Sequence, residues 1–235
     1  MEDELKRVMV VLAHPDDPEF MCGGTVARWA AEGKEIIYVL ATRGDKGSDD
    51  PTMTPERLAQ IREQEQRAAA AVLGVREVIF MGYPDGELVP DLRLRRDITR
   101  LIRQVRPDIV ITADPTTRYF GSNYINHPDH RAIGEATLDA VYPAARDRFN
   151  FIELWRDEGL EPHKVREVYV GNTYEADVQV DITDYIDKKI AALLEHKSQI
   201  KDPAGLAERI RQRASASSDG AGPPYVERFR RFVLS

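Results

Sequence analysis

A chain of 235 residues, 42% of them hydrophobic and 31% charged, has the composition of a globular protein with a substantial core. Its net charge of −7 and its dispersed basic residues argue against a nucleic-acid partner, which a strongly basic face would indicate. No stretch approaches the ~20 apolar residues of a membrane span, so we expect no membrane partner. The single cysteine, Cys22, excludes an internal disulfide and a cysteine-rich zinc motif, and we expect a cytoplasmic protein.

Strand and helix patterns alternate through the first half of the chain. The strands are short apolar runs, and the helices begin after capping residues and end before residues such as glycine. In chain order the predicted elements are a strand over 7–12, a helix over 20–32, a strand over 35–41, a helix over 55–73, a strand over 77–81, a helix over 91–105 and a strand over 109–112. Repeated βα units predict an α/β fold: a Rossmann-like, predominantly parallel sheet with helices on both faces.

The second half of the chain continues this pattern more loosely. The predicted elements there are a loop over 114–126, a helix from 127 to about 141, strands over 165–170 and 178–182, a helix over 183–199 capped by Thr183, a loop over 214–224 and an amphipathic segment over 226–234. We expect the last segment to dock back on the domain or to contact another subunit. Neither an internal repeat nor a domain boundary is evident, which predicts one domain over 1–235, with its core at about 7–200 and an extension at about 201–235.

The first predicted strand ends in Ala13-His14-Pro15-Asp16-Asp17. In an open α/β sheet, ligands bind at the carboxyl ends of the strands. One histidine and two carboxylates offer two ligands for a divalent metal ion and one spare base. His14 and Asp17 can face one point around Pro15, while Asp16 can stay outside the ligand set. The alternative is that the two aspartates do no more than cap the next helix.

A second cluster, His127-Pro128-Asp129-His130, follows the predicted loop over 114–126. Proline is favoured at the first position of a helix, which would place His127 at the cap and His130 one turn inside. Both imidazoles can then reach a cleft at the carboxyl end of the strand over 109–112, and Asp129 can fix the tautomer of one of them. The two clusters together predict a hydrolytic metal site.

The remaining two histidines and the cysteine receive structural interpretations. His163 lies in a polar linker, where we expect it to be exposed to solvent. His196 falls on the predicted amphipathic helix over 183–199. Cys22 is expected to be a small buried residue, because no spacing ties it to a base.

These motifs resemble those of the LmbE-like/PIG-L zinc-dependent N-acetylglucosaminyl deacetylases. The resemblance rests on the strand ending in His-Pro-Asp-Asp, on Thr42-Arg43-Gly44-Asp45 after the second strand, and on the distal His-Pro-Asp-His. It covers about residues 7–145, and two short segments, 181–183 and 196–199, also resemble the family. Members of this family remove acetyl groups from N-acetylglucosaminyl compounds, including precursors of mycothiol and bacillithiol and glycosyl-phosphatidylinositol intermediates.

The resemblance implies a role for each residue of the first cluster. It implies zinc ligation by His14 and Asp17, with His130 of the second cluster as the third ligand, and Asp16 as general base. A His₂-Asp set suits several divalent ions, so Fe²⁺ is an alternative to Zn²⁺. In this chain Pro18 stands between the two aspartates and Glu19, whereas the family usually has glutamate there directly.

The resemblance also implies how the reaction and the substrate are handled. It implies that His127 is the charged group facing the oxyanion, oriented by Asp129, and that Arg43 contacts the sugar. Asp85, in Tyr-Pro-Asp-Gly, is a further candidate for substrate binding. Some members have a tyrosine where this chain has an isoleucine, and Tyr124 stands beside that position.

The function we expect is therefore metal-dependent removal of an N-acetyl group from a small N-acetylglucosamine-type sugar or glycoconjugate, giving acetate and a free amine. Two alternatives stay open at this point: hydrolysis of another amide or ester by the same centre, and a non-catalytic sugar-binding α/β domain. The resemblance also favours a homo-oligomer.

Overall fold

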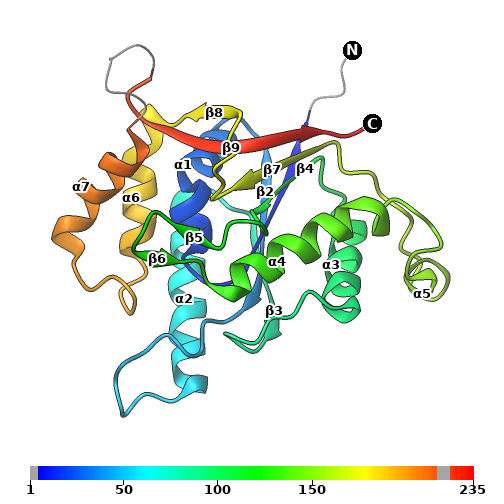
Figure 1. Cartoon of the computed structure of the whole chain (residues 1–235), viewed down its shortest axis with the longest axis horizontal. Coiled ribbons are helices and arrows are strands. Elements are labelled where there is room, and N and C mark those ends of the chain that lie inside the picture. Colours follow the sequence, from blue (N-terminus) through cyan, green and yellow to red (C-terminus); the bar gives the residue numbers. More distant parts are fainter. Residues whose placement is uncertain (1–4, 216–222) are drawn as a thin grey trace.

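Seven strands form the central sheet, in the order β3-β2-β1-β4-β7-β9-β8 (Figure 1). The computed structural model describes residues 5–215 and 223–235, so most of the loop predicted over 214–224 lies outside the described residues. The strands are β1 (Arg7–Leu12), β2 (Glu35–Thr42), β3 (Glu77–Tyr83), β4 (Ile109–Ala113), β7 (Glu167–Gly171), β8 (Val178–Asp181) and β9 (Val226–Val233). The first five in spatial order pair in parallel, whereas β9 is antiparallel to both of its neighbours. The predicted α/β fold is confirmed.

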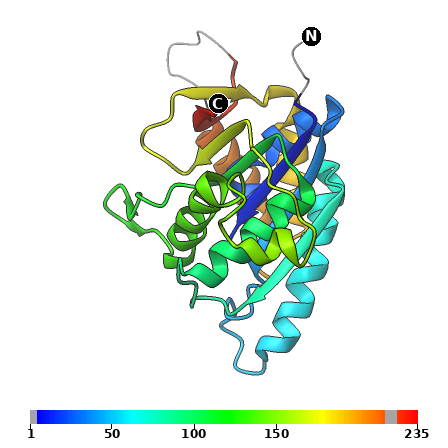
Figure 2. The ribbon, with the colours of Figure 1, turned by 90° about the vertical axis from the view of Figure 1, so that its right-hand side faces the viewer.

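Helices cover both faces of this sheet, which explains why its strands are continuous apolar runs. On one face lie α1 (Asp17–Ala31), α2 (Pro55–Leu73), α6 (Ile186–Leu194) and α7 (Pro203–Ala214), and on the other α3 (Leu92–Val105) and α4 (Pro128–Asp139) (Figures 1 and 2). Residues of β1 alternate between the two cores: Val8 and Val10 join the cluster beneath α1 and α2, whereas Met9 and Val11 join the cluster with α3 and α4.

Local signals set the boundaries of α2 and α3 as predicted. The hydroxyl of Thr54 accepts a hydrogen bond from the backbone of Arg57, and Gly74 ends α2 with a φ of 82°. Asp91 caps α3 in the same way, through the backbone of Leu94. These ends were predictable because a cap lies within a few residues of the group that it satisfies.

The start of α1 was predicted wrongly. The helix begins at Asp17 rather than Phe20, because Pro18 is compatible with the first turn, where backbone N–H groups have no partner within the helix. A break at Cys22, with φ −139° and ψ 17°, separates this first turn from the rest of α1. The strand predicted over 77–81 was also ended too early, since β3 continues to Tyr83.

The helix predicted over 183–199 is wrong in both length and cap. A 3₁₀ turn, Thr183–Tyr185, precedes α6, and α6 ends at Leu194. Thr183 donates its hydroxyl hydrogen bond to Asp181 instead of capping α6. The chain leaves the helix after Leu194, and His196 beyond it is fully buried.

Several short elements were not predicted. A hairpin of β5 (Tyr119–Phe120) and β6 (Tyr124–Ile125) occupies the predicted loop over 114–126 and extends from the body of the domain (Figure 2). A π-helical turn, Ala140–Ala144, continues α4, and α5 spans Ile152–Arg156. No helix in the described ranges combines the length and apolar character that crossing a bilayer requires.

The amphipathic segment predicted over 226–234 does dock back, as strand β9. It is inserted between β7 and β8, with Val170 opposite Arg230 on one side and Val180 opposite Glu227 on the other. The C-terminal part of the chain is therefore built into the sheet. Its glutamate at 227 is buried, which becomes important for the site described below.

Close contact between α4 and the end of β4 requires glycine at position 134. A Cβ there would overlap the backbone carbonyl of Ala113. We expect Gly134→Ala to lower the free energy of unfolding by about 1–3 kcal/mol or more, as for other overpacked sites, because backbone cannot move aside like a flexible side chain. Chemical denaturation measures the effect.

The neighbouring exposed residue provides the control for this substitution. Glu135→Ala changes the same turn of α4 but lies on its solvent side, so its effect should stay within about 0.5 kcal/mol. Equal stability of the two variants would show that α4 tolerates displacement from β4.

Candidate metal centre

Polar residues from distant parts of the chain meet at the carboxyl edge of the sheet. His14, Asp16 and Asp17 follow β1 directly, and Asp85 follows β3. Asp129 lies in the first turn of α4. Because β1, β3 and β4 run parallel, their carboxyl ends share one edge, so both predicted clusters lie at the same place.

The imidazole of His14 is the centre of this group. Its Nδ1 lies 3.3 Å from Asp17 Oδ2, and its Nε2 lies 3.1 Å from Asp85 Oδ1 and 3.2 Å from Asp129 Oδ2. Burial alone would lower the pKa of His14, but the charge of Asp17 and the hydrogen bonds with the three carboxylates raise it to about 12. The site thus has a strong excess of negative charge around one buried imidazole.

Asp17 joins the two clusters. Its Oδ1 lies 3.1 Å from His130 Nε2, while its other oxygen faces His14. The opposite ring nitrogen of His130 is 2.9 Å from Asn126 Oδ1, and the amide of Asn126 is held by the carbonyl of Thr117. Burial would raise the pKa of Asp17, but the two imidazoles hold it well below its usual value. The three residues predicted as metal ligands are therefore brought into mutual contact through Asp17.

His127 caps α4, but its ring is held differently from the prediction. Its Nδ1 accepts a hydrogen bond from the backbone N–H of Asp129 at 3.2 Å, whereas the Asp129 carboxylate is 4.0 Å away. Nitrogen that accepts a hydrogen bond carries no proton, so this contact places the proton of a neutral ring on Nε2. Burial and the charge of His14 lower the pKa of His127. The charged state implied by the family resemblance stays a prediction.

The carboxylate of Asp129 is used elsewhere. It accepts hydrogen bonds from the backbone of Gly86 at 2.7 Å and of Leu88 at 3.2 Å, and it contacts His14. Fully buried, it ties the loop after β3 to the start of α4. Asp129 therefore supports His14 directly and contacts His127 mainly through its own backbone.

The donor atoms present here fit a divalent metal ion. Two groups have ligand atoms within 4.8 Å of one another: His14 with His127 and His130, and His14 with Asp85 and Asp129. Imidazole nitrogen and carboxylate oxygen are ligands of Zn²⁺ and of related ions. A cation would also balance the carboxylates that otherwise crowd around His14. This cluster of histidine and aspartate residues can therefore bind a metal.

Asp16 adopts a strained backbone conformation beside this cluster. Its φ is 83°, which is rare for a residue with a side chain, and its carboxylate makes no capping hydrogen bond to α1. Oδ2 instead lies 3.2 Å from Arg62 Nη2. Burial raises the pKa of Asp16 to about 6, against the lowering effect of Arg62. The alternative that the aspartates serve simply as helix caps is thus not supported.

Two polar residues of α2 hold this strained turn, and sequence reasoning missed both. Arg62 donates to the carbonyls of Pro15 at 2.7 Å and of Gly44 at 3.0 Å. Gln66 accepts from the backbone N–H of Asp16 at 2.9 Å. Arg62 and Gln66 are four residues apart, hence on one face of α2, and both are buried. Two polar residues within the buried stripe of an amphipathic helix were the signal available.

Glu19 and His196 extend this support to the end of α6. The fully buried carboxylate of Glu19 accepts from Gln66 Nε2 at 2.9 Å and lies 3.2 Å from His196 Nε2. His196 was placed on an amphipathic helix by the sequence pattern, but it follows α6 and has no exposed surface. Its partner is distant in sequence, so no local pattern could reveal it.

Of the structural predictions for Cys22 and His163, the first is confirmed and the second is wrong. Cys22 is buried, as predicted. His163 was expected to be exposed, but it is partly buried, and its Nε2 lies 2.7 Å from the carbonyl of Pro107. Pro107 precedes β4, so His163 lies toward the amino end of the sheet, away from the metal centre.

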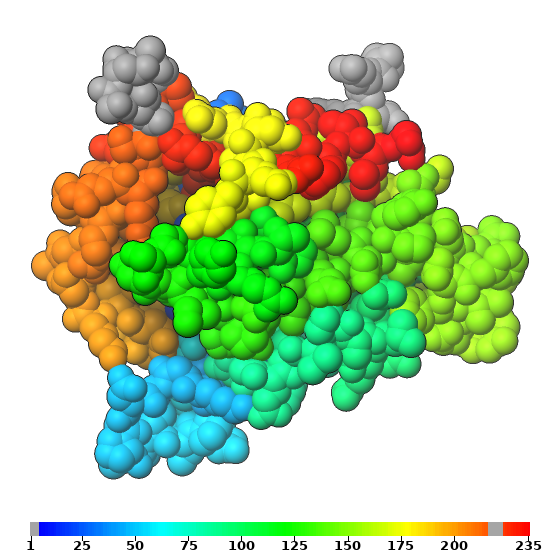
Figure 3. Space-filling view, viewed as in Figure 1, coloured from blue at the N-terminus to red at the C-terminus, as the bar shows by residue number. Residues whose placement is uncertain are grey.

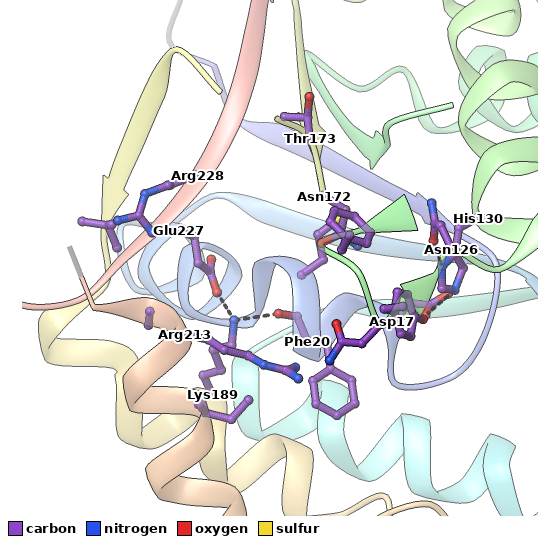
Figure 4. Close-up of a pocket in the computed structure, with 17 residues that line it drawn as sticks. Asp17, Phe20, Asn126, His130, Asn172, Thr173, Lys189, Arg213, Glu227 and Arg228 are labelled. Carbon is purple, nitrogen blue, oxygen red and sulfur yellow. Dashed lines mark hydrogen bonds and ion pairs between the residues drawn. The ribbon is translucent and has the colours of Figure 1, made fainter. Parts of the chain in front are cut away.

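A cavity of about 740 Å³ opens beside the metal centre. Figure 3 shows the surface hollowed between the β5–β6 hairpin, in green, and α7, in orange. Asp17 and His130 form one end of the lining, and the cavity continues past Phe20 toward Arg213 and Arg228 (Figure 4). Its size is within the range of small-molecule sites.

The residues predicted to bind substrate occupy different positions relative to this cavity. Tyr124, in β6, lines the cavity and is 50% exposed. Asp85 is buried against His14 and accepts from the backbone of Lys46. Arg43 is exposed after β2, with its Nη1 3.3 Å from Glu63. Tyr124 alone of these three belongs to the cavity lining.

The environment of His196 predicts how the stability of the protein changes with pH. Burial would lower its pKa, but the hydrogen bond with Glu19 and nearby carboxylates raise it. The contacts of protonated His196 therefore stabilise the folded state fully below the unfolded-state pKa of about 6.5. This stabilisation is lost as pH rises through the pKa that His196 has in the folded protein. The stability difference between the parent protein and His196→Gln should therefore shrink as pH rises above about 6.5, as measured by urea denaturation.

His163 is the matched control, because its pKa is shifted the other way. Burial lowers the pKa of His163, so the unfolded state binds more protons just below pH 6.5. The stability difference between the parent and His163→Gln should increase as pH rises through about 6.5. If the stability differences of the two variants changed with pH in the same direction, the opposite pKa shifts given for His196 and His163 would be wrong.

Comparison with known proteins shows the family to which this chain belongs. Residues 9–141 match the PIG-L family model, described as GlcNAc-PI de-N-acetylase. Over 85% of its length the chain is 33% identical to diacetylchitobiose deacetylase of Thermococcus kodakarensis, of which it covers 72%. Over 83% of its length it is 30% identical to a probable N-acetyl-alpha-D-glucosaminyl L-malate deacetylase 2 of Bacillus anthracis, of which it covers 81%.

Solved structures show the same relationship. The structure of N,N'-diacetylchitobiose deacetylase from Pyrococcus horikoshii superposes with a TM-score of 0.87 at 32% identity, covering 97% of this chain and 84% of that one. GalB, the 4-carboxy-2-hydroxymuconate hydratase from Pseudomonas putida, has a TM-score of 0.80 at 21% identity, covering 98% of this chain and 97% of that one. The second likeness shows the fold alone. The match to the family model and the identity to the deacetylases together show that this chain belongs to the PIG-L family of de-N-acetylases.

Proposed function

We propose that this protein is a metal-dependent hydrolase that removes the N-acetyl group from an N-acetylglucosamine-type sugar or glycoconjugate, releasing acetate and a free amine. The observation that carries this proposal is the contact of Asp17 with both His14 and His130, with Asp16 beside them but outside that contact. A binding domain would need no spare base at this place. The names of the related deacetylases support the choice of an N-acetylated sugar.

We assign metal binding to His14, Asp17 and His130, and we expect Zn²⁺, with Fe²⁺ as the alternative. Three protein ligands leave an open position, so a bound ion would polarise the amide carbonyl and make water a better nucleophile. Asp85 and Asp129, against the other ring nitrogen of His14, would hold that imidazole in a fixed orientation.

Asp16 would then act as general base. A pKa raised by burial gives its carboxylate a useful affinity for the proton of the attacking water, and Arg62 holds the carboxylate in place. The same carboxyl group can return the proton to the leaving amine. Nε2 of His127 is available as a donor to the developing oxyanion, an interaction that typically contributes about 3 kcal/mol.

The cavity would accept the sugar and the group attached to it. Tyr124 would contact the sugar from the hairpin side, and Arg43 and Asp85 remain candidate substrate contacts from the loops after β2 and β3. The cavity extends well beyond Asp17 and His130, which supports a substrate larger than the N-acetyl group and its own ring. The related proteins named for disaccharide and malate-linked substrates are consistent with this reading.

We further propose a homo-oligomer that works in the cytoplasm. Exposed apolar residues of the β5–β6 hairpin support an interface there, since Ile125 is 85% and Tyr119 66% exposed. Mass measurement in solution by light scattering tests the oligomeric state.

Acetate release tests the function itself. The purified protein, stripped of metal and then reloaded with Zn²⁺ or Fe²⁺, should release acetate from N-acetylglucosamine, diacetylchitobiose or an N-acetylglucosaminyl conjugate when metal is present. Acetylated amines and esters without a sugar serve as comparison substrates. Hydrolysis confined to the comparison substrates would indicate another amidase or esterase, and metal-independent sugar binding without hydrolysis would indicate a binding domain.

The ligand assignment predicts which histidines control metal content. His130→Ala should lose most of the bound metal, because it removes one of three ligands at the carboxyl edge of the sheet. His163→Ala should keep full metal content, since His163 bonds to Pro107 at the opposite end. Elemental analysis of the purified variants measures both, and full metal content in His130→Ala would rule out this ligand set.

The assignment of Asp16 makes a separate prediction. Asp16→Asn should retain near-parental metal content and lose at least ~10²-fold in turnover, the lower range for removal of a general base. Turnover is followed by acetate release and metal by elemental analysis. A metal-free Asp16→Asn variant would show instead that Asp16 is a ligand.

A further inference from the structure

The break in α1 leaves backbone groups that a continuous helix would pair. In an unbroken helix the N–H of Gly24 donates to the carbonyl of Phe20, four residues earlier. The non-helical Cys22 lies between them. The short turn before the break carries Asp17, and the long segment after it packs on the sheet.

Two charged residues from the C-terminal half of the chain bind these groups, and Figure 4 shows the contacts of Lys189 with Phe20 and with Glu227. Glu227, in β9, accepts hydrogen bonds from the backbone N–H of Gly24 at 2.9 Å and of Thr25 at 2.7 Å. Lys189, in α6, donates to the carbonyl of Phe20 at 2.9 Å and to Glu227 at 2.6 Å. The pair thus supplies an acceptor on one side of the break and a donor on the other.

Burial of the two charges destabilises the folded protein unless each charge keeps its partners. Lys189 is 4% exposed and Glu227 5% exposed. Charges taken out of water need well-placed partners, and the carboxylate is also favourably placed at the start of the second helical segment. Although both residues line the cavity, the Glu227 oxygens already bind backbone and Lys189.

Phe20 connects this pair to the turn that carries Asp16 and Asp17. Its N–H donates to the carbonyl of Asp16 at 3.0 Å, while its own carbonyl accepts from Lys189. Without the pair, the simplest way to satisfy the orphaned groups of Gly24 and Phe20 is to close the break into a regular helix. That closure would rotate the turn that carries Asp17.

We propose that Lys189 and Glu227 are positioning residues that keep α1 broken at Cys22 and thereby hold Asp17 in its metal-binding orientation. Strand β9 and helix α6 are then part of the support of the active site. This inference rests on the proposed function in one respect, the assignment of Asp17 as a metal ligand.

The test replaces the buried pair by apolar residues of similar size. A buried ion pair can often be exchanged for hydrophobic residues without loss of stability, so Lys189→Met/Glu227→Leu is expected to fold. The control is Arg211→Gln/Asp187→Asn, which removes an exposed pair that links α6 to α7. Zn²⁺ dissociation constants are measured by competition with a chelator, and thermal unfolding of the metal-free proteins reports their stability.

We expect the buried-pair variant to bind Zn²⁺ at least tenfold more weakly than the parent protein, and the control variant to bind as the parent does. A folded buried-pair variant with parental Zn²⁺ affinity would overturn the positioning role while leaving the proposed function intact. A parent protein that binds neither Zn²⁺ nor Fe²⁺ would overturn both.

A measurement on the unaltered protein covers the case in which the variant does not fold. Coupling between sites is reciprocal, so Zn²⁺ should slow hydrogen exchange at the amides of Gly24 and Thr25 if these contacts position the ligand turn. The amide of Gly205, held by Asp202 at the start of α7, is the reference. Unchanged exchange at Gly24 and Thr25 on saturation with Zn²⁺ would overturn the inference.

Discussion

Three carboxylates converge on one buried imidazole, and the arrangement of the site depends on this convergence. Asp17, Asp85 and Asp129 each approach His14 within 3.3 Å. Burial of several like charges is unfavourable unless a positive charge balances them. The parallel sheet enforces the approach, because the carboxyl ends of its strands share an edge. A divalent cation bound here would relieve the repulsion, and the histidine nitrogens and carboxylate oxygens of the cluster are suitable ligands for one.

The turn that carries Asp16 and Asp17 is held by several other elements in addition to the first turn of α1. Arg62 and Gln66 bind it from α2, and the Glu19–His196 contact links it to the end of α6. A left-handed backbone at Asp16 is sustained by these contacts, since strain of this kind persists where the surroundings over-determine the conformation. The conformation of this turn is therefore a product of tertiary packing.

The same scaffold supports different reactions, so the fold alone does not identify the chemistry. A hydratase shares the architecture at 21% identity, whereas N,N'-diacetylchitobiose deacetylase from Pyrococcus horikoshii shares it at 32% identity. In this chain, Asp16 directly precedes Asp17, which contacts both His14 and His130. The cavity beside these residues is lined by the β5–β6 hairpin and by the C-terminal elements α7 and β9.

The sequence by itself determined the α/β class, the ends of α2 and α3, and the two polar clusters, because each depends on neighbours along the chain. Apolar runs identify buried strands, and caps such as Thr54 act within one turn. Tertiary structure alone decided that Asp129 supports His14, that His196 is buried against Glu19, and that Glu227 binds α1. Those partners are separated by 115, 177 and 203 residues, so sheet order and helix packing, which no local pattern encodes, bring them together.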